Sequence, residues 1–163
     1  MTSVFVELAE RMKAEMADLE DAVTRAARAW ARSDDAAVDK DIYLDSVALN
    51  LHGFYSGLER LFELIARHID QVLPSGETWH RDLLARMCHD IADVRPAVVS
   101  EKSERQLDAL RRFRHLVRNV YATNLVPEKL ASLVDGLREH WPGLQAELLA
   151  FAQFLEYVAR DED

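Results

Sequence analysis

A cluster of arginines on one short stretch is the strongest sign of chemistry in this sequence. Arg111, Arg112, Arg114 and Arg118 lie close together in a chain whose formal net charge is -9. Arg111, Arg114, Arg118 and Tyr121 follow one another at steps of three, four and three, which places them along one flank of an amphipathic helix. Two interpretations stay open: ion pairs with nearby carboxylates, or an anion site that fits a nucleic-acid phosphate. From the residues alone we favour the ion pairs.

The elements that must position these side chains are predicted to be helices throughout. Apolar residues recur at steps of three or four along most of the chain, and no stretch alternates with period two. Ser100 before Glu101 and Glu104 is typical of a helix start, and Arg95-Pro96 of a helix stop. The expected helices span about residues 4–31, 44–72, 79–91, 101–122 and 127–158. We therefore predict one all-α domain over residues 1–163.

Three residues inside the predicted helices need a local explanation. Pro142 interrupts the last helix, but the apolar phase continues past it, which indicates a kinked helix or two nearly coaxial pieces. Gly53 and Gly57 lie four apart on the second helix, where each costs about 1 kcal/mol relative to alanine. We expect them to let a neighbouring backbone come close.

The bulk properties exclude several classes of protein. No apolar run approaches the roughly 20 residues of a membrane span, and the N-terminus does not resemble a secretion signal. A single cysteine, Cys88, excludes an internal disulfide, so we expect a cytoplasmic location. Only Glu77 and His80 show the Glu-x-x-His spacing of di-iron bundles, so we predict no metal and no cofactor. The acidic balance argues against broad nucleic-acid affinity, so any RNA contact must be confined to a local patch or be built when two chains meet.

The run Arg114-His-Leu-Val-Arg-Asn119-Val-Tyr121 resembles the signature of the HEPN superfamily, specifically of its HepT-like toxins. That signature is an arginine, four to six residues, a histidine, one residue and a tyrosine. Arg114 falls on the arginine and Tyr121 on the tyrosine, but Asn119 stands where the family has its histidine. Residues 51–60 and 73–84 resemble the same subgroup in order and spacing.

The resemblance implies a HEPN-like up-and-down bundle of about five helices and a metal-independent endoribonuclease that acts as a toxin. Arg114 would bind the phosphate, because guanidinium binds phosphate bidentately, and Arg111 and Arg118 would assist it. Asn119 cannot act as a base, so cleavage should be slower by the roughly 10²–10⁴-fold that general acid–base catalysis contributes. His115, four residues after Arg111 on the same helical face, is an alternative base.

The resemblance also implies partners. They are a second copy of the chain in a homodimer, RNA as the substrate, and a minimal nucleotidyltransferase antitoxin that attaches AMP to Tyr121. Packing at the helix end is the other interpretation of Tyr121. Asn119 is consistent with a deliberate substitution or with a natural loss of activity. The alternative function is a non-catalytic HEPN-fold module that binds a nucleotidyltransferase or RNA.

The remaining histidines are interpreted as half-buried packing residues. This group comprises His52, His68, His89 and His140. His80, beside Trp79, receives the same interpretation, with the additional role of holding its loop in place.

Overall fold

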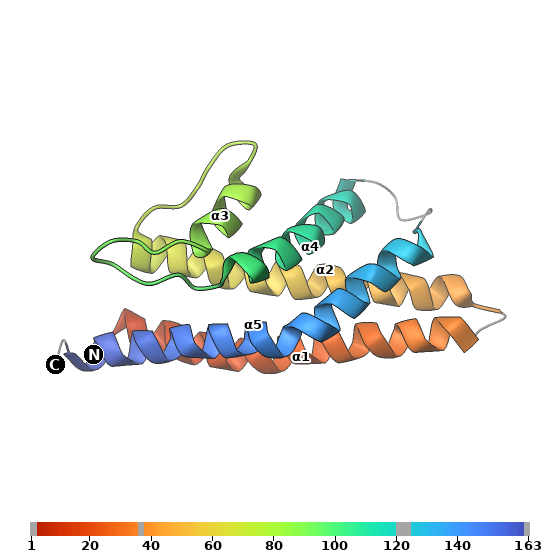
Figure 1. The fold of residues 1–163 in the computed structure, drawn as a ribbon, viewed down its shortest axis with the longest axis horizontal. Helices are drawn as coiled ribbons and strands as arrows, with labels where there is room; N and C mark the ends of the chain where they lie inside the picture. Colours follow the sequence, from red (N-terminus) through yellow and green to blue (C-terminus); the bar gives the residue numbers. More distant parts are fainter. Residues whose placement is uncertain (1–2, 36–37, 120–124, 162–163) are drawn as a thin grey trace.

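Five α-helices make up the fold in the computed structural model, which describes residues 3–35, 38–119 and 125–161 (Figure 1). They are α1 (Val4–Asp35), α2 (Lys40–Ile65), α3 (Trp79–Met87), α4 (Glu101–Asn119) and α5 (Pro127–Asp161). A single π-helical turn, η1 (Ala66–Asp70), extends α2. The described ranges contain one isolated β-bridge, between Ile91 and Arg95, and no strand. The predicted all-α bundle of about five helices is confirmed.

The three long helices lie side by side and form the body of the bundle (Figure 1). Helix α1 runs antiparallel to both α2 and α5, so the two chain ends lie at the same end of the molecule. Helix α4 packs against α2 and α5, and the short α3 packs against α4 and α2. This arrangement places the arginine-bearing helix α4 on the outside of the bundle, with α3 beside it.

The core confirms the predicted apolar seams. Each long helix buries residues spaced three or four apart, as Met12, Met16 and Leu19 are on α1. Phe54 of α2 meets Trp141 of α5 edge to face, with ring centroids 5.5 Å apart. Edge-to-face contact suits the positive edge and negative face of aromatic rings and adds about 0.5–1.5 kcal/mol beyond area burial.

Helix α5 is one continuous helix that bends part-way along its length (Figure 1). Pro142 lies inside it, where the missing N–H and the ring clash with the preceding turn account for the bend. Trp141 and Leu144 are buried on either side of the proline, so the apolar face persists through the bend. The kinked-helix interpretation therefore holds.

Two local predictions are wrong: that the third helix extends to about residue 91, and that Gly53 and Gly57 let a neighbouring backbone come close. Helix α3 stops at Met87, and the chain then turns so that the N–H of Ile91 donates to the carbonyl of Arg95 (2.8 Å). A Cβ added at Gly53 would meet nothing within 4 Å, and one added at Gly57 would meet a side-chain carbon of Leu19 at 3.4 Å. Within the part of the chain that the structure describes, no neighbouring backbone therefore approaches either glycine.

A buried ion pair fixes the loop after α3 to the end of α2. Arg95 donates to Asp70 from Nε (2.5 Å to Oδ1) and from Nη2 (2.8 Å to Oδ2), and both side chains are completely buried. Arg86 of α3 donates from Nε to the same carboxylate (2.6 Å). Bidentate arginine–carboxylate pairing fixes the relative orientation of the two side chains and also strengthens their interaction. This cluster therefore fixes the C-terminal end of α3 against the bundle.

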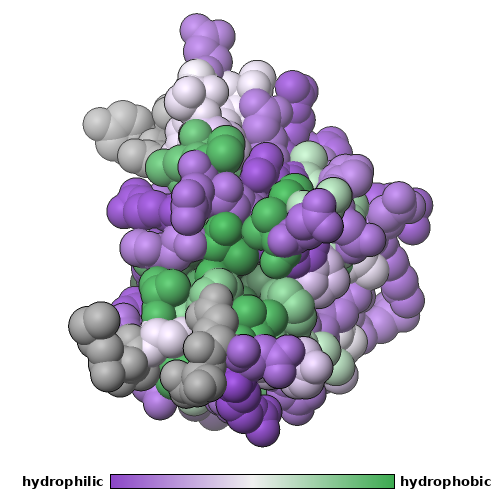
Figure 2. Space-filling model, turned by 90° about the vertical axis from the view of Figure 1, so that its left-hand side faces the viewer, coloured by the Kyte–Doolittle hydropathy of each residue, from purple (hydrophilic) through white to green (hydrophobic). Residues whose placement is uncertain are grey.

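The end of the molecule that holds both termini carries a gathering of apolar side chains (Figure 2). The exposed large apolar residues of the described chain include Val4, Val72, Leu73 and Val94. None of these four residues belongs to α3 or α4. Within the described residues, no helix is long and apolar enough to cross a membrane.

Candidate functional site

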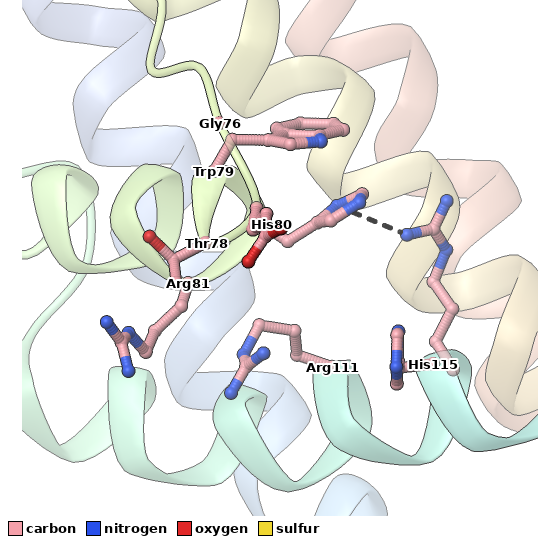
Figure 3. A pocket seen from close by; sticks show the side chains of 9 residues that line it. Gly76, Thr78, Trp79, His80, Arg81, Arg111 and His115 are labelled. Atoms are coloured by element: carbon pink, nitrogen blue, oxygen red, sulfur yellow. Dashed lines mark hydrogen bonds between the residues drawn. The ribbon is translucent and has the colours of Figure 1, made fainter.

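A cavity of about 560 Å³ lies between the first turn of α3 and the middle of α4 (Figure 3). Arg111 and His115 project from α4 on one side of it, and Trp79 and His80 lie on the other side (Figure 3). The complete lining is Gly76, Glu77, Thr78, Trp79, His80, Arg81, Arg111, Arg114 and His115. Three arginines thus line one cavity in a protein of net charge -9.

Arg114 is held at the cavity wall by two residues of α2. Its Nε donates to Ser56 Oγ (2.9 Å), and its Nη1 lies 3.0 Å from Glu59 Oε1. Glu59 is only 3% exposed, whereas the Arg114 side chain is 15% exposed. A buried carboxylate without a cationic partner is costly, so Arg114 serves the fold as well as the cavity.

Arg111 and Arg112 share a different carboxylate, that of Asp108 one turn earlier on α4. Arg111 Nε donates to Asp108 Oδ1, and Arg112 Nε donates to Oδ2, each at 2.8 Å. Partial burial raises the pKa of Asp108, but the hydrogen bonds and charges of the two arginines outweigh it and leave that pKa below its ordinary value. Arg112 is 72% exposed and does not line the cavity. The predicted ion pairs are therefore present, and they coexist with a basic cavity.

His80 lines the cavity and is half-buried, as its interpretation as a packing residue predicted. Its Nδ1 lies 2.9 Å from Glu59 Oε2, and its ring stacks on Trp79 with centroids 3.6 Å apart. The dashed line in Figure 3 marks a longer approach of 3.5 Å to Arg114 Nη1. Glu59 therefore joins α3 to α4 by holding His80 through one oxygen and Arg114 through the other.

Tyr55 lies one turn before Glu59 on α2 and is completely buried. Burial raises the pKa of its hydroxyl, and the Glu59 carboxylate raises it further, against the opposite influence of Arg111 and Arg114. The hydroxyl has no hydrogen-bond partner among the described residues. Tyr55 thus stays a neutral phenol beside the charged groups of the cavity.

The other histidines differ in their surroundings. His52 and His140 are half-buried, as predicted, but His68 and His89 are exposed. His140 Nε2 lies 2.7 Å from Ser103 Oγ, which itself donates to Glu147 Oε2 (2.5 Å). Because Ser103 gives its only proton to Glu147 and is completely buried, this trio joins α4 to α5 and offers no accessible nucleophile.

The structure brings three predicted site residues together and leaves three outside its description. Arg111, Arg114 and His115 line the cavity. The side chains of Arg118 and Asn119, and all of Tyr121, lie outside the described residues. In the described ranges, no group of three or more histidine, cysteine or acidic side chains is placed to hold a metal ion.

Sequence reasoning missed Glu59 as a member of the site. It lies four residues after Tyr55 and next to Leu58, on a face of α2 that is otherwise apolar. A charged residue on a buried face is almost always paired, so its position on that face was the available signal.

Comparison with known proteins agrees with the motif. A family model described as "HepT-like protein" matches residues 46–155, well over half of the chain. No curated protein and no solved structure matches the chain. The matched range contains all of the resembling runs and every described residue of the cavity wall. The chain therefore belongs to the HepT-like family of the HEPN superfamily.

Proposed function

We propose that this chain is the toxin component of a bacterial toxin–antitoxin pair and that the cavity between α3 and α4 binds a phosphate of RNA. The observation that carries the proposal is the presence of Arg81, Arg111 and Arg114 in the lining of one cavity of an acidic protein. The volume of about 560 Å³ suits a ligand of nucleotide size, since ligand pockets measure roughly 300–1,000 Å³.

Arg114 has the geometry of a phosphate ligand. Its described contacts use Nε and Nη1, so Nη2 has no protein partner among the described residues. The guanidinium is already fixed by Ser56 and Glu59, so little side-chain entropy remains to be lost when an anion binds. Arg111, three residues earlier on α4, adds a second cation on the same wall.

Asn119 sets the expected rate of the proposed reaction. Its amide can donate and accept hydrogen bonds but cannot remove the proton of a ribose 2′-hydroxyl. The chain as given should therefore cleave RNA about 10²–10⁴-fold more slowly than an Asn119→His form. A chain that binds RNA or a nucleotidyltransferase without cleaving RNA would instead be an interaction module of the same fold.

The cavity is tested by RNA binding, measured by fluorescence anisotropy with labelled single-stranded RNA. We expect Arg114→Ala to weaken binding and Arg114→Lys to restore it only in part, because lysine cannot bind phosphate bidentately. Arg112→Ala is the matched control, because this arginine lies on the same helix but outside the cavity. Equal losses for Arg112→Ala and Arg114→Ala would mean that net charge, and not the cavity, governs binding.

The partners are part of the same proposal and rest on the family resemblance. We propose a cytoplasmic homodimer that is inhibited by a minimal nucleotidyltransferase antitoxin through adenylation of Tyr121. Mass spectrometry after incubation with that antitoxin and ATP should show one added adenylate, which Tyr121→Phe abolishes. Sedimentation analysis should show a dimer.

A further inference from the structure

We propose that His80, oriented by Glu59, is the acid–base residue with which this chain cleaves RNA in the absence of a histidine at position 119. The inference rests on the proposed function and deepens it, because it assigns proton transfer to a residue outside the arginine motif. It follows from the cavity geometry: an imidazole, a buried carboxylate and a guanidinium contact one another where the cavity opens.

The hydrogen bond to Glu59 decides which ring nitrogen of His80 is available. Glu59 Oε2 lies 2.9 Å from Nδ1, within ordinary hydrogen-bond distance, and a carboxylate can only accept. The guanidinium of Arg114 is a donor, and at 3.5 Å from Nδ1 it lies beyond that range. Nδ1 of the neutral ring therefore carries the proton and donates it to Glu59. The lone pair for base catalysis is then on Nε2.

The ring is also held in place and accessible. Trp79 stacks on one face of His80 at a centroid distance of 3.6 Å, and Glu59 is fixed in turn by Arg114. The His80 side chain is 26% exposed, although its partner Glu59 is 3% exposed. A carboxylate that orients a histidine and stabilises its charged form is the arrangement by which many enzymes prepare a general base.

The opposite wall supplies what proton transfer at phosphate requires. Arg111 and His115 project from α4 toward the cavity that His80 enters from α3 (Figure 3). Arg111 and Arg114 offer positive charge for a phosphate in which negative charge grows during the reaction. A phosphate bound between the two helices would thus have cations on the α4 side and the imidazole of His80 on the α3 side.

The reaction is balanced without metal or external reactant. His80 Nε2 takes the proton of the ribose 2′-hydroxyl as the 2′-oxygen bonds to phosphorus, and the bond from phosphorus to the 5′-oxygen breaks. The imidazolium, stabilised by Glu59, returns the proton to the departing 5′-oxygen. The products are a 2′,3′-cyclic phosphate and a 5′-hydroxyl end. Glu59 is a positioning residue in this scheme, because it touches His80 and not the RNA.

His115 is the competing base on the same cavity. It lies on an exposed position of α4 and lines the same cavity, so its imidazole could take the same proton. The case for His80 rests on its own contacts with Glu59 and Trp79. The experiment therefore compares both residues.

The test uses the full chain and a pool of end-labelled single-stranded RNA oligonucleotides, with cleavage and binding measured separately. We expect His80→Gln to abolish the slow cleavage that the chain shows with Asn119 and to leave RNA affinity unchanged, because glutamine cannot transfer the proton. His115→Gln should retain most of the rate. His89→Gln is the matched control, since this histidine lies just beyond α3 and is exposed. Thermal unfolding verifies that each variant is folded.

A double-mutant comparison separates positioning from structure. If Glu59 acts by orienting His80, Glu59→Gln should slow cleavage by the unmodified chain at saturating RNA but should not slow the His80→Gln variant further. A purely structural role for Glu59 would lower both rates alike.

Two results would overturn the assignment of His80, and a third would overturn the proposed function as well. A folded His80→Gln variant that cleaves as fast as the unmodified chain overturns it, as does an unmodified chain that binds RNA at the cavity without cleaving it. In both cases the cavity remains an RNA site. If Arg114→Ala binds RNA as tightly as the unmodified chain, the proposed function itself fails.

Discussion

Asp70→Asn is expected to be among the most damaging single substitutions in this chain. The carboxylate accepts two hydrogen bonds from Arg95 and one from Arg86, and both Asp70 and Arg95 are completely buried. The amide keeps the shape of the side chain but removes the charge and one acceptor oxygen. The Arg95 guanidinium then stays buried without its counter-charge.

The magnitude follows from the burial of that cation. Removing one partner of a buried ion pair costs about 3–5 kcal/mol, because the other charge is left uncompensated. Arg95 keeps hydrogen bonds to the backbone carbonyls of His89, Pro96 and Arg86, at 3.1, 3.1 and 3.3 Å. These three hydrogen bonds place the expected loss of unfolding free energy near the lower end of that range, at about 3 kcal/mol.

Urea unfolding followed by circular dichroism measures the change. The control is Asp21→Asn, whose ion pair with Arg25 spans 3.7 Å and is exposed on both sides, so a change below about 1 kcal/mol is expected. A cost for Asp70→Asn no larger than that of Asp21→Asn would refute the view that the buried pair fixes the loop. Hydrogen exchange should show faster opening of α3 in the variant, since Arg86 also loses a charged partner.

Three further predictions concern single sites. Gly53→Ala should raise the unfolding free energy by about 1 kcal/mol in urea titration, because a Cβ there meets open space; a loss would indicate that another chain approaches this face. Burial, with Glu104 adding to it, raises the pKa of Cys88 to about 12, which lowers the thiolate fraction at neutral pH. A thiolate of higher pKa is also more nucleophilic, so iodoacetamide should alkylate Cys88 roughly 30-fold more slowly in the folded chain than in the unfolded chain. Equal alkylation rates would contradict this. Burial also lowers the pKa of His140 despite Glu147, so the unfolded state takes up the proton first and stability should fall as the pH drops through about 6.5. His140→Gln should reduce this slope in unfolding measured across that range, and an unchanged slope would assign it to other groups.

Local periodicity was enough to predict the helices but not their ends. The apolar seams of α1 and α5 follow from residues spaced three and four apart, and the phase across Pro142 showed that α5 continues. The end of α3 was missed because Ile91 keeps the helical phase while Arg95, committed to Asp70 of η1, draws the chain into a turn. That pairing joins residues distant in sequence, and no local pattern encodes it.

The candidate site, like the helices, could be predicted only in part from local sequence patterns. Arg111, Arg114 and His115 lie on one helix, so their spacing alone placed them on one side of it. Glu59 and His80 join them only because α2 and α3 both pack against α4. The predicted ion pairs are present, and the carboxylates of Asp108 and Glu59 hold Arg111 and Arg114 at the wall of the cavity.

The most direct test of the account is the rate at which the purified chain cleaves labelled single-stranded RNA, alone and as Asn119→His, each with and without Arg114→Ala. The account predicts slow cleavage by the chain as given, an increase of about 10²–10⁴-fold with Asn119→His, and loss of both activities with Arg114→Ala. Failure of both the chain and its Asn119→His form to bind or cleave RNA would contradict it.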